Sequence, residues 1–256
     1  MAEIFHQRDV FMTQPPSTFH PLRILFYNLL GAALVLSWWS PNLLIWEELD
    51  DAVFFVTNAW LHEDNTAWVV FVAAINNRFF DLVSFLVLLA IYLWAIRRDP
   101  VLEHRLLRWG GIGITMLLTA GILSQAVRYA IPWDRHSPTL VYDDVNLITQ
   151  MVGFDTKDVS ATSFPGDHGL MLMLFTAFLW RFSGRTVGLV SALAAILLSM
   201  PRVLGGAHWF SDVFNGALAI CLITLPWVLC TPVAPAMARG ITRGMVAVKT
   251  RLLPAR

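Results

Sequence analysis

The sequence is poor in charged residues and in cysteine. Asp, Glu, Lys and Arg make up only 14% of its 256 residues, against roughly 25% in soluble domains, so a soluble globular fold is excluded. Nine residues separate its two cysteines, Cys221 and Cys230. On a helix that separation is about 13 Å, too far for a disulfide. No cluster has the spacing of a zinc site, and we expect neither a metal nor a cofactor.

Apolar residues are abundant and occur in runs. They make up 57% of the chain, and runs of this kind are typical of membrane spans. No cleavage pattern follows the first run, so we expect it to be retained. We predict an all-α, polytopic membrane bundle of about six spans, at 22–37, 82–96, 110–131, 168–182, 187–200 and 211–229.

The chain is expected to form a single membrane domain over residues 1–256. Within it we distinguish an N-terminal segment (1–21), N-terminal spans with an amphipathic region (22–109), a catalytic core (110–230) and a basic tail (231–256). Residues 45–55 carry acidic and apolar faces, which favours an amphipathic helix at the membrane surface. Residues 68–75 are too short to span and are interpreted as a re-entrant or interfacial piece. Pro201 is expected to end the fifth span.

Basic residues are distributed unevenly between the two sides that six spans create. The side with both termini and the even-numbered loops holds 13 of the 18 Lys and Arg residues. The other side holds Arg78, Arg128, Arg135, Lys157 and Arg202. The positive-inside rule therefore predicts cytoplasmic termini, with these five residues on the outer face.

One stretch, residues 202–212 (RVLGGAHWFSD), concentrates ionisable side chains in apolar surroundings. His208 and Asp212 are four residues apart, so on a helix they share a face. A carboxylate there can accept the N–H of one imidazole nitrogen and leave the other as a nucleophile. Arg202 carries a planar group suited to phosphate. The alternative interpretation is that His208 and Asp212 only pair to satisfy a polar helix end.

Two further pieces, residues 128–135 (RYAIPWDR) and 163–169 (SFPGDHG), lie at the same predicted membrane depth. Phosphoryl transfer needs cations around the phosphate oxygens, an in-line nucleophile and an acid for the leaving oxygen. Such a site needs no metal. The expected roles are His208 as nucleophile, Asp212 as the residue that orients it, His168 as general acid, and Arg135, Arg202 and Arg128 as phosphate ligands.

These pieces resemble the motifs of the type 2 phosphatidic acid phosphatase superfamily. Its pattern is Lys-x6-Arg-Pro, then Pro-Ser-Gly-His, then Ser-Arg-x5-His-x3-Asp. Residues 202–212 match the third motif, with Pro201 in place of Ser. Residues 165–168 (PGDH) match the second motif in Pro and His only. Residues 128–135 match the first with Arg for Lys, and His136 stands in place of Pro.

The departures from that pattern resemble a narrower group, the bacterial inner-membrane lipid A 1-diphosphate synthases. The stretches that carry this likeness are 76–78 (NNR), 137–140 (SPTL), 164–169 (FPGDHG), 201–203 (PRV) and 206–210 (GAHWF). The resemblance implies transfer of a phosphate from undecaprenyl pyrophosphate to the 1-phosphate of lipid A on the periplasmic face. The products would be lipid A 1-diphosphate and undecaprenyl phosphate, formed through a phosphohistidine at His208. It implies lipid substrates, membrane lipids and no nucleic acid as partners.

Several residues near the motifs keep two interpretations. Asp167 either binds the acceptor or tunes His168, or it caps the fourth span. Asn77 and Arg78, with Asp81, either hold a second lipid headgroup or form a capped, ion-paired start to the second span. His136 is a candidate headgroup contact. Lys157 and Asp158 are interpreted as solvated surface.

Two other functions fit parts of the sequence. A hydrolase of the same fold, acting on undecaprenyl pyrophosphate or another lipid phosphate, would differ only in using water as acceptor. A transporter or scaffold would also contain buried charges. Its charges would run through the bilayer, however, and its halves would repeat, whereas here the charges lie at one face.

Overall fold

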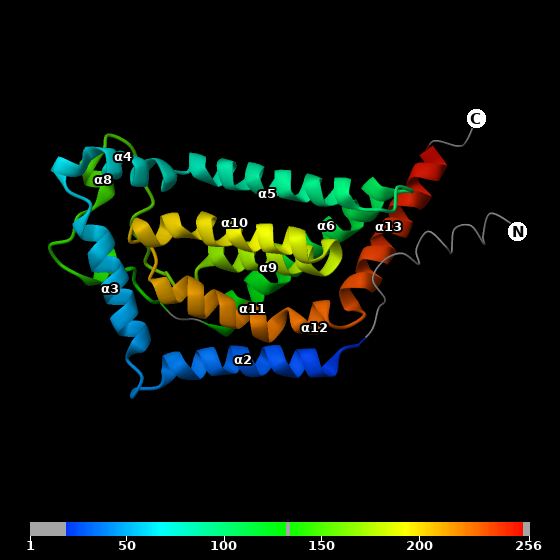
Figure 1. Ribbon diagram of the computed structural model, residues 1–256, viewed down its shortest axis with the longest axis horizontal. Helices are drawn as coiled ribbons and strands as arrows, with labels where there is room; N and C mark the ends of the chain where they lie inside the picture. The colour runs from blue at the N-terminus through cyan, green and yellow to red at the C-terminus, as the bar shows by residue number, and fades with distance from the viewer. Residues whose placement is uncertain (1–18, 132–133, 253–256) are drawn as a thin grey trace, which may run out of the picture.

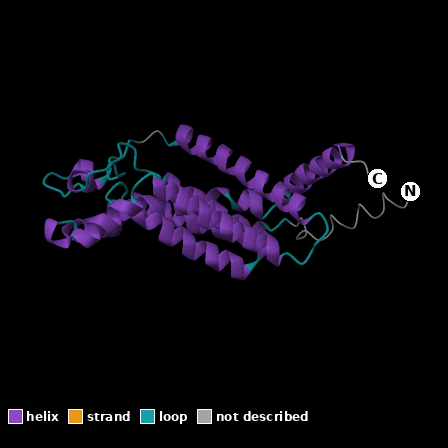
Figure 2. Ribbon diagram, turned by 90° about the horizontal axis from the view of Figure 1, so that it is seen from above, coloured by secondary structure: helices purple, strands orange, loops and turns teal. Residues whose placement is uncertain are grey.

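The computed structural model describes residues 19–131 and 134–252, and these form helices joined by loops, with no strand (Figures 1 and 2). Most of the predicted N-terminal segment, residues 132–133 of the first motif and the last four residues of the tail lie outside this range. The described elements are α2 (Pro21–Trp39), α3 (Ile45–Ala59), η1 (Glu63–Asn65), α4 (Thr66–Ile75), α5 (Phe79–Arg98), α6 (Arg105–Ala130), α7 (Pro138–Val141), α8 (Ile148–Met151), α9 (Asp167–Ser183), α10 (Arg185–Leu204), η2 (Asp212–Ala217), α11 (Leu218–Thr224), α12 (Pro226–Leu229) and α13 (Val233–Leu252).

The long helices form an elongated bundle that confirms the predicted class of fold. Five segments of the described chain are long and apolar enough to cross a membrane: α2, α5, α6, α10 and residues 212–229. The remaining predicted span, the fourth (168–182), corresponds to α9, whose 17 residues lie in the middle of the bundle beside α10 (Figure 1). Its Leu170, Phe178 and Leu179 are fully buried in the main core. The protein is therefore an all-helical, multi-pass membrane protein.

The last span begins as a π-helix, η2, and continues through α11 and α12. Single π-helical turns occur often at functional sites. Here the π-helical turn starts at Asp212, so the last predicted motif residue is also the first residue of the span.

Helix α3 lies across one end of the bundle, between the end of α2 and α4 (Figure 1). The sequence predicted a surface helix here, and the helix forms, but one side of it is buried. Asp50, Phe54 and Asn58 repeat every four residues and face inward. Asn58 is bonded to the backbone of Asn146 in the loop before α8, at 2.8 Å and 3.0 Å. We call this end of the molecule the α3 end.

The basic tail forms helix α13, which packs against α6 at the opposite end of the bundle. The contact is close because Gly111 of α6 has no side chain. A Cβ atom at this position would lie 2.6 Å from the carbonyl oxygen of Ala238 and would also strike Thr242. The tail is thus part of the packed structure.

We expect Gly111→Ala to lower stability by about 1–3 kcal/mol, because the added methyl group would separate α6 from α13. Gly121→Ala is the matched control, since a Cβ atom there meets nothing within 4 Å and alanine is the better helix former. Thermal unfolding of both variants in detergent would measure the difference. Equal midpoints would contradict the close α6–α13 contact.

Candidate active site

The predicted site lies at the α3 end, where α9 begins and α10 ends. The sequence predicted that Pro201 ends the fifth span, but α10 continues through it to Leu204. Proline is tolerated in membrane helices because neighbouring groups compensate for the lost hydrogen bond. The extra turn places Arg202 on the helix itself. The chain then reverses at Gly206, whose φ of +75° suits glycine.

This reversal brings His208 back to Arg202. The carbonyl oxygen of Arg202 accepts the amides of Ala207 and His208, at 3.0 Å and 3.1 Å. The start of α9 docks on the same segment. The amide of Gly166 donates to the carbonyl of Asp212, at 3.3 Å, and Gly169 leaves room for Val213. The second and third motifs are therefore in contact.

The imidazole of His208 is oriented by a backbone carbonyl. Its Nδ1 lies 2.7 Å from the oxygen of Ser163, and the Ser163 amide in turn donates to the carbonyl of Arg135, at 2.7 Å. A carbonyl oxygen only accepts, so Nδ1 carries the proton and Nε2 keeps its lone pair. The sequence analysis missed Ser163 in this role, because a backbone acceptor leaves no trace in the residue type.

Asp212 lies behind His208 and is fully buried. One of its oxygens is 3.6 Å from Nδ1 of His208, longer than a hydrogen bond, and accepts the amide of Trp209 at 2.9 Å. The sequence predicted that the two side chains are close, and they are, but His208 lies in a bend before the helix that carries Asp212, so they do not share a helix face. In this arrangement the carboxylate of Asp212 lies near the imidazole without a hydrogen bond to it, and the hydrogen bond of Nδ1 goes to the Ser163 carbonyl.

Arg135 is held by two carboxylates. Its Nη1 donates to Asp212, at 2.6 Å, and to the hydroxyl of Ser211, at 2.9 Å, and its Nη2 donates to Asp50, at 2.9 Å. The guanidinium group also lies over the ring of Trp209, 5.0 Å from its centroid. Both terminal nitrogens of this predicted phosphate ligand are therefore already bonded to protein groups.

Asp50 of α3 was missed by the sequence analysis as a site residue. Burial raises the pKa of its carboxyl group, and hydrogen bonds from Ser211 and Arg135 oppose this. The available signal was its four-residue spacing from Phe54 and Asn58, which places it on the inward face of the helix.

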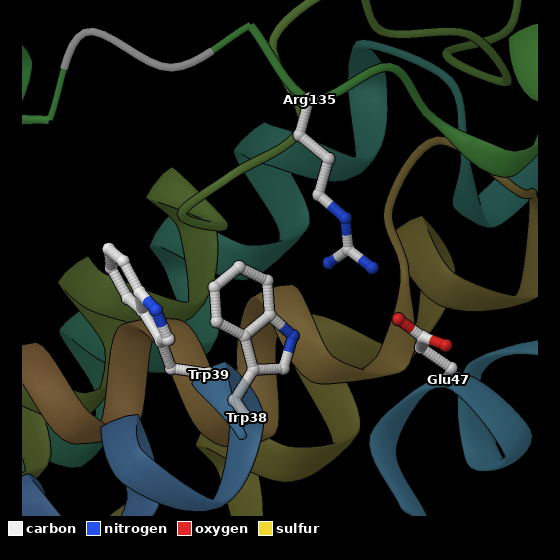
Figure 3. Close-up of a pocket in the computed structure, with 4 residues that line it drawn as sticks. All are labelled: Trp38, Trp39, Glu47 and Arg135. Atoms are coloured by element: carbon white, nitrogen blue, oxygen red, sulfur yellow. The ribbon is translucent and has the colours of Figure 1, made fainter. Parts of the chain in front are cut away.

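A cavity opens beside Arg135 at the same end of the bundle. It is lined by Trp38, Trp39, Glu47 and Arg135, and Figure 3 shows the guanidinium group pointing into the space between Trp38 and Glu47. The indole of Trp38 also stacks on Phe164 of the second motif, with ring centroids 5.4 Å apart. The end of α2 therefore contributes to the surroundings of the site.

A second group of ionisable side chains gathers around Asp81 of α5. Its Oδ1 accepts from Nη2 of Arg202, at 3.0 Å, and lies 3.6 Å from Nε2 of His168. Its Oδ2 accepts from Nζ of Lys157, at 2.5 Å. The structure thus brings the predicted His168 and Arg202 together on one carboxylate.

Other predicted residues stand apart from this group. Arg128, in the last turn of α6, is exposed and forms no ion pair among the described residues. His136 is also exposed, and its carbonyl accepts Nε1 of Trp209 at 2.7 Å. Arg78 is exposed at the start of α5, where Asn77 accepts the Phe79 amide at 2.6 Å. This bond and the ion pairs of Asp81 fit the capped, ion-paired alternative.

Two interpretations of single residues were wrong. Asp167 does not cap α9, because Gly166 occupies the cap position and the exposed Asp167 is the first residue of the helix, with no capping bond. Asp158 is not solvated surface, and Lys157, although its side chain is 34% exposed, is held in an ion pair. Lys157 pairs with Asp81, and the buried Asp158 accepts the amide and hydroxyl of Thr149, at 2.8 Å and 2.9 Å. The loop before α9 folds back over the α3 end, and polar composition does not reveal such a path.

The described residues contain no group of three or more His, Cys, Asp or Glu side chains placed to hold a metal ion. The chemistry available to the site is that of a free imidazole nitrogen at His208, a neighbouring imidazole at His168 and the guanidinium of Arg202. This set is suited to a phosphoryl group.

Comparison with known proteins agrees with this chemistry. The model of the PAP2 superfamily matches residues 109–234. Lipid A 1-diphosphate synthase of Escherichia coli (strain K12) is 40% identical over 215 residues, which cover 83% of this chain and 89% of that protein. No solved structure matched. The family and this relative support an enzyme that acts on phosphate groups. Because the identity extends over most of both chains, the protein belongs to the PAP2 superfamily.

Proposed function

We propose that this protein transfers the terminal phosphate of undecaprenyl pyrophosphate to the 1-phosphate of lipid A through a phosphohistidine at His208. The observation that carries the proposal is the 2.7 Å contact between Nδ1 of His208 and the carbonyl oxygen of Ser163. Because this contact uses Nδ1, Nε2 remains as a nucleophile, with the imidazole of His168 and the guanidinium of Arg202 as its neighbouring polar groups. The name of the E. coli relative supports the choice of donor and acceptor.

The first step forms the phosphohistidine. Nε2 of His208 attacks the terminal phosphorus, the bond from phosphorus to the bridging oxygen breaks, and His168 donates a proton to the departing undecaprenyl phosphate. Arg202 stabilises the charge on the equatorial oxygens. Asp212, 3.6 Å from Nδ1, stabilises the positive charge that develops on the imidazole.

The second step returns the enzyme to its starting state. His168 takes a proton from the phosphate of the lipid acceptor, one of whose oxygens attacks the phosphohistidine, and the bond between phosphorus and Nε2 breaks. The products are lipid A 1-diphosphate and free His208. Neither step requires a metal, because cationic side chains balance the phosphate charge.

The active site is proposed to face the periplasm, with both termini in the cytoplasm. The α3 end carries the site, and the opposite end carries α13 with its arginines and lysine (Figure 1). Basic residues favour the cytoplasmic side of a membrane. In a bacterial inner membrane this orientation presents the site to lipids of the outer leaflet.

A hydrolase is the second candidate, and the exposure of the general acid favours it. The side chain of His168 is 37% exposed, so water can reach the group that would take its proton. A hydrolase and a transferase would form the same intermediate and differ only in the group that attacks it.

The donor assay separates the two candidates. With undecaprenyl pyrophosphate labelled in its terminal phosphate, we expect label on lipid A and none with His208→Ala. The exposed His62 gives the control, His62→Ala, which should transfer label normally. Release of label only as free phosphate, with lipid A present, would contradict the transferase and retain the hydrolase.

Asp212→Asn should lower kcat by roughly 10²–10⁴-fold, because the imidazolium loses its neighbouring charge. Asp50→Asn is the matched control, since it removes the other carboxylate from Arg135 and leaves Asp212 beside His208. We expect it to lower thermal stability and to change kcat by less than about tenfold. Equal losses of kcat in the two variants would mean that Asp212 acts only through Arg135.

Asp167→Gly should shift product partition toward free phosphate, because Asp167 is exposed at the start of α9, next to His168 and free of a capping role. The ratio of labelled lipid A to free phosphate measures this. Asp155→Asn, at an exposed loop position, controls for the loss of one surface charge. An unchanged ratio in Asp167→Gly would exclude Asp167 from acceptor selection.

A further inference from the structure

The carboxylate of Asp81 is an anion held by three basic groups. Arg202 and Lys157 each donate to one of its oxygens, at 3.0 Å and 2.5 Å, and His168 lies 3.6 Å away. Yet Asp81 and Lys157 are 39% and 34% exposed. An ion pair that is so exposed to water contributes little stability. A purely structural role therefore explains the cluster poorly.

Only one of the two terminal nitrogens of Arg202 has a hydrogen-bond partner in this arrangement. The residue is 8% exposed, and its Nη1 is buried with no hydrogen-bond partner. A buried cationic nitrogen without a partner is costly. The guanidinium therefore has a bond left to donate, which an anion with more than two oxygens can accept.

Lys157 is fixed at this place by its backbone. Its amide donates to the carbonyl of Asn76, at 2.9 Å. The side chain of Asn76 in turn packs against Gly205, where a Cβ atom would come within 2.6 Å of it. Gly205 follows α10 directly, so Lys157 is held next to the helix end that carries Arg202.

The first motif does not supply these cations. Arg128 is exposed, and both terminal nitrogens of Arg135 are bonded to Asp50, Asp212 or Ser211. The cations that contact Asp81 beside His168 are Lys157, whose partner is exposed, and Arg202, whose Nη1 has no partner.

We propose that Lys157, Arg202 and His168 form the phosphoryl-binding site, and that Asp81 occupies it until a phosphoryl group displaces the carboxylate. This rests on the proposed function only in that the substrate carries a phosphoryl group. Lys157 is then a phosphate ligand from outside the three motifs, and Asp81 is a competitor built into the chain.

The proposal predicts opposite effects at the two partners of one ion pair. Removing the charge of Asp81 removes the competitor and strengthens phosphoryl binding. Removing the charge of Lys157 removes a ligand and weakens it. If the pair only maintained the shape of the loop, both changes would weaken binding.

Calorimetric titration of orthovanadate into the full-length protein in detergent tests this without any lipid substrate. We expect Asp81→Asn to lower Kd by about tenfold and Lys157→Ala to raise it by about tenfold, the scale of one charge-assisted hydrogen bond. Lys157→Arg, which keeps the cation, should stay within about threefold of the unchanged protein. Asp155→Asn, two residues from Lys157 and exposed, should leave Kd unchanged.

Weaker binding in both Asp81→Asn and Lys157→Ala would overturn the proposal, and so would an unchanged Kd in Lys157→Ala. Because no lipid is present, the outcome is independent of which donor or acceptor the enzyme uses. In the transfer assay, a raised KM for the pyrophosphate donor in Lys157→Ala would place the donor's phosphoryl group at Lys157. A raised KM for the acceptor alone would place the acceptor's phosphate there.

Discussion

The pairing of the partly buried guanidinium group of Arg135 with two buried carboxylates is the interaction on which the α3 end of the bundle depends. It joins Asp212 of the last span to Asp50 of α3, and a buried charge that loses its partner is strongly destabilising. Through Ser211, Asp50 also binds the start of the last span, at 2.7 Å and 2.6 Å. The surface helix, the loop before α7 and the last span are thereby fixed around His208.

The two sides of His208 differ in how completely their polar groups are satisfied. Behind the imidazole, Ser163, Asp212 and Arg135 form a connected network that fixes the ring. On the side of His168, Arg202 has an unpartnered nitrogen, and its other bond goes to a carboxylate that water can reach. The connected network holds the imidazole of His208 in place, while the incompletely paired Arg202 has a hydrogen-bond donor left over for another anion.

Sequence patterns predicted the spatial arrangement of the residues best for the third motif and worst for the first motif. Arg202, His208 and Asp212 lie in one short stretch, so local spacing and a glycine reversal nearly determine their arrangement. Arg128 and Arg135 are seven residues apart at the end of α6, and the chain leaves the helix between them. One is consequently exposed and the other is bound to two carboxylates, a difference that depends on what packs against the helix end.

Composition and periodicity were sufficient to predict the class of fold, because every segment that crosses a bilayer as a helix must be long and apolar, whichever helices pack against it. The short spacing of His208 and Asp212 was also sufficient to predict that they are close, although His208 lies in a bend before the helix and not within it. The hydrogen bond from His208 to Ser163 and the ion pairs Asp50–Arg135 and Asp81–Lys157 join residues 45 to 85 positions apart. No local pattern encodes such pairs, because they form only when the packed helices and the folded loop bring distant charges into one low-dielectric site.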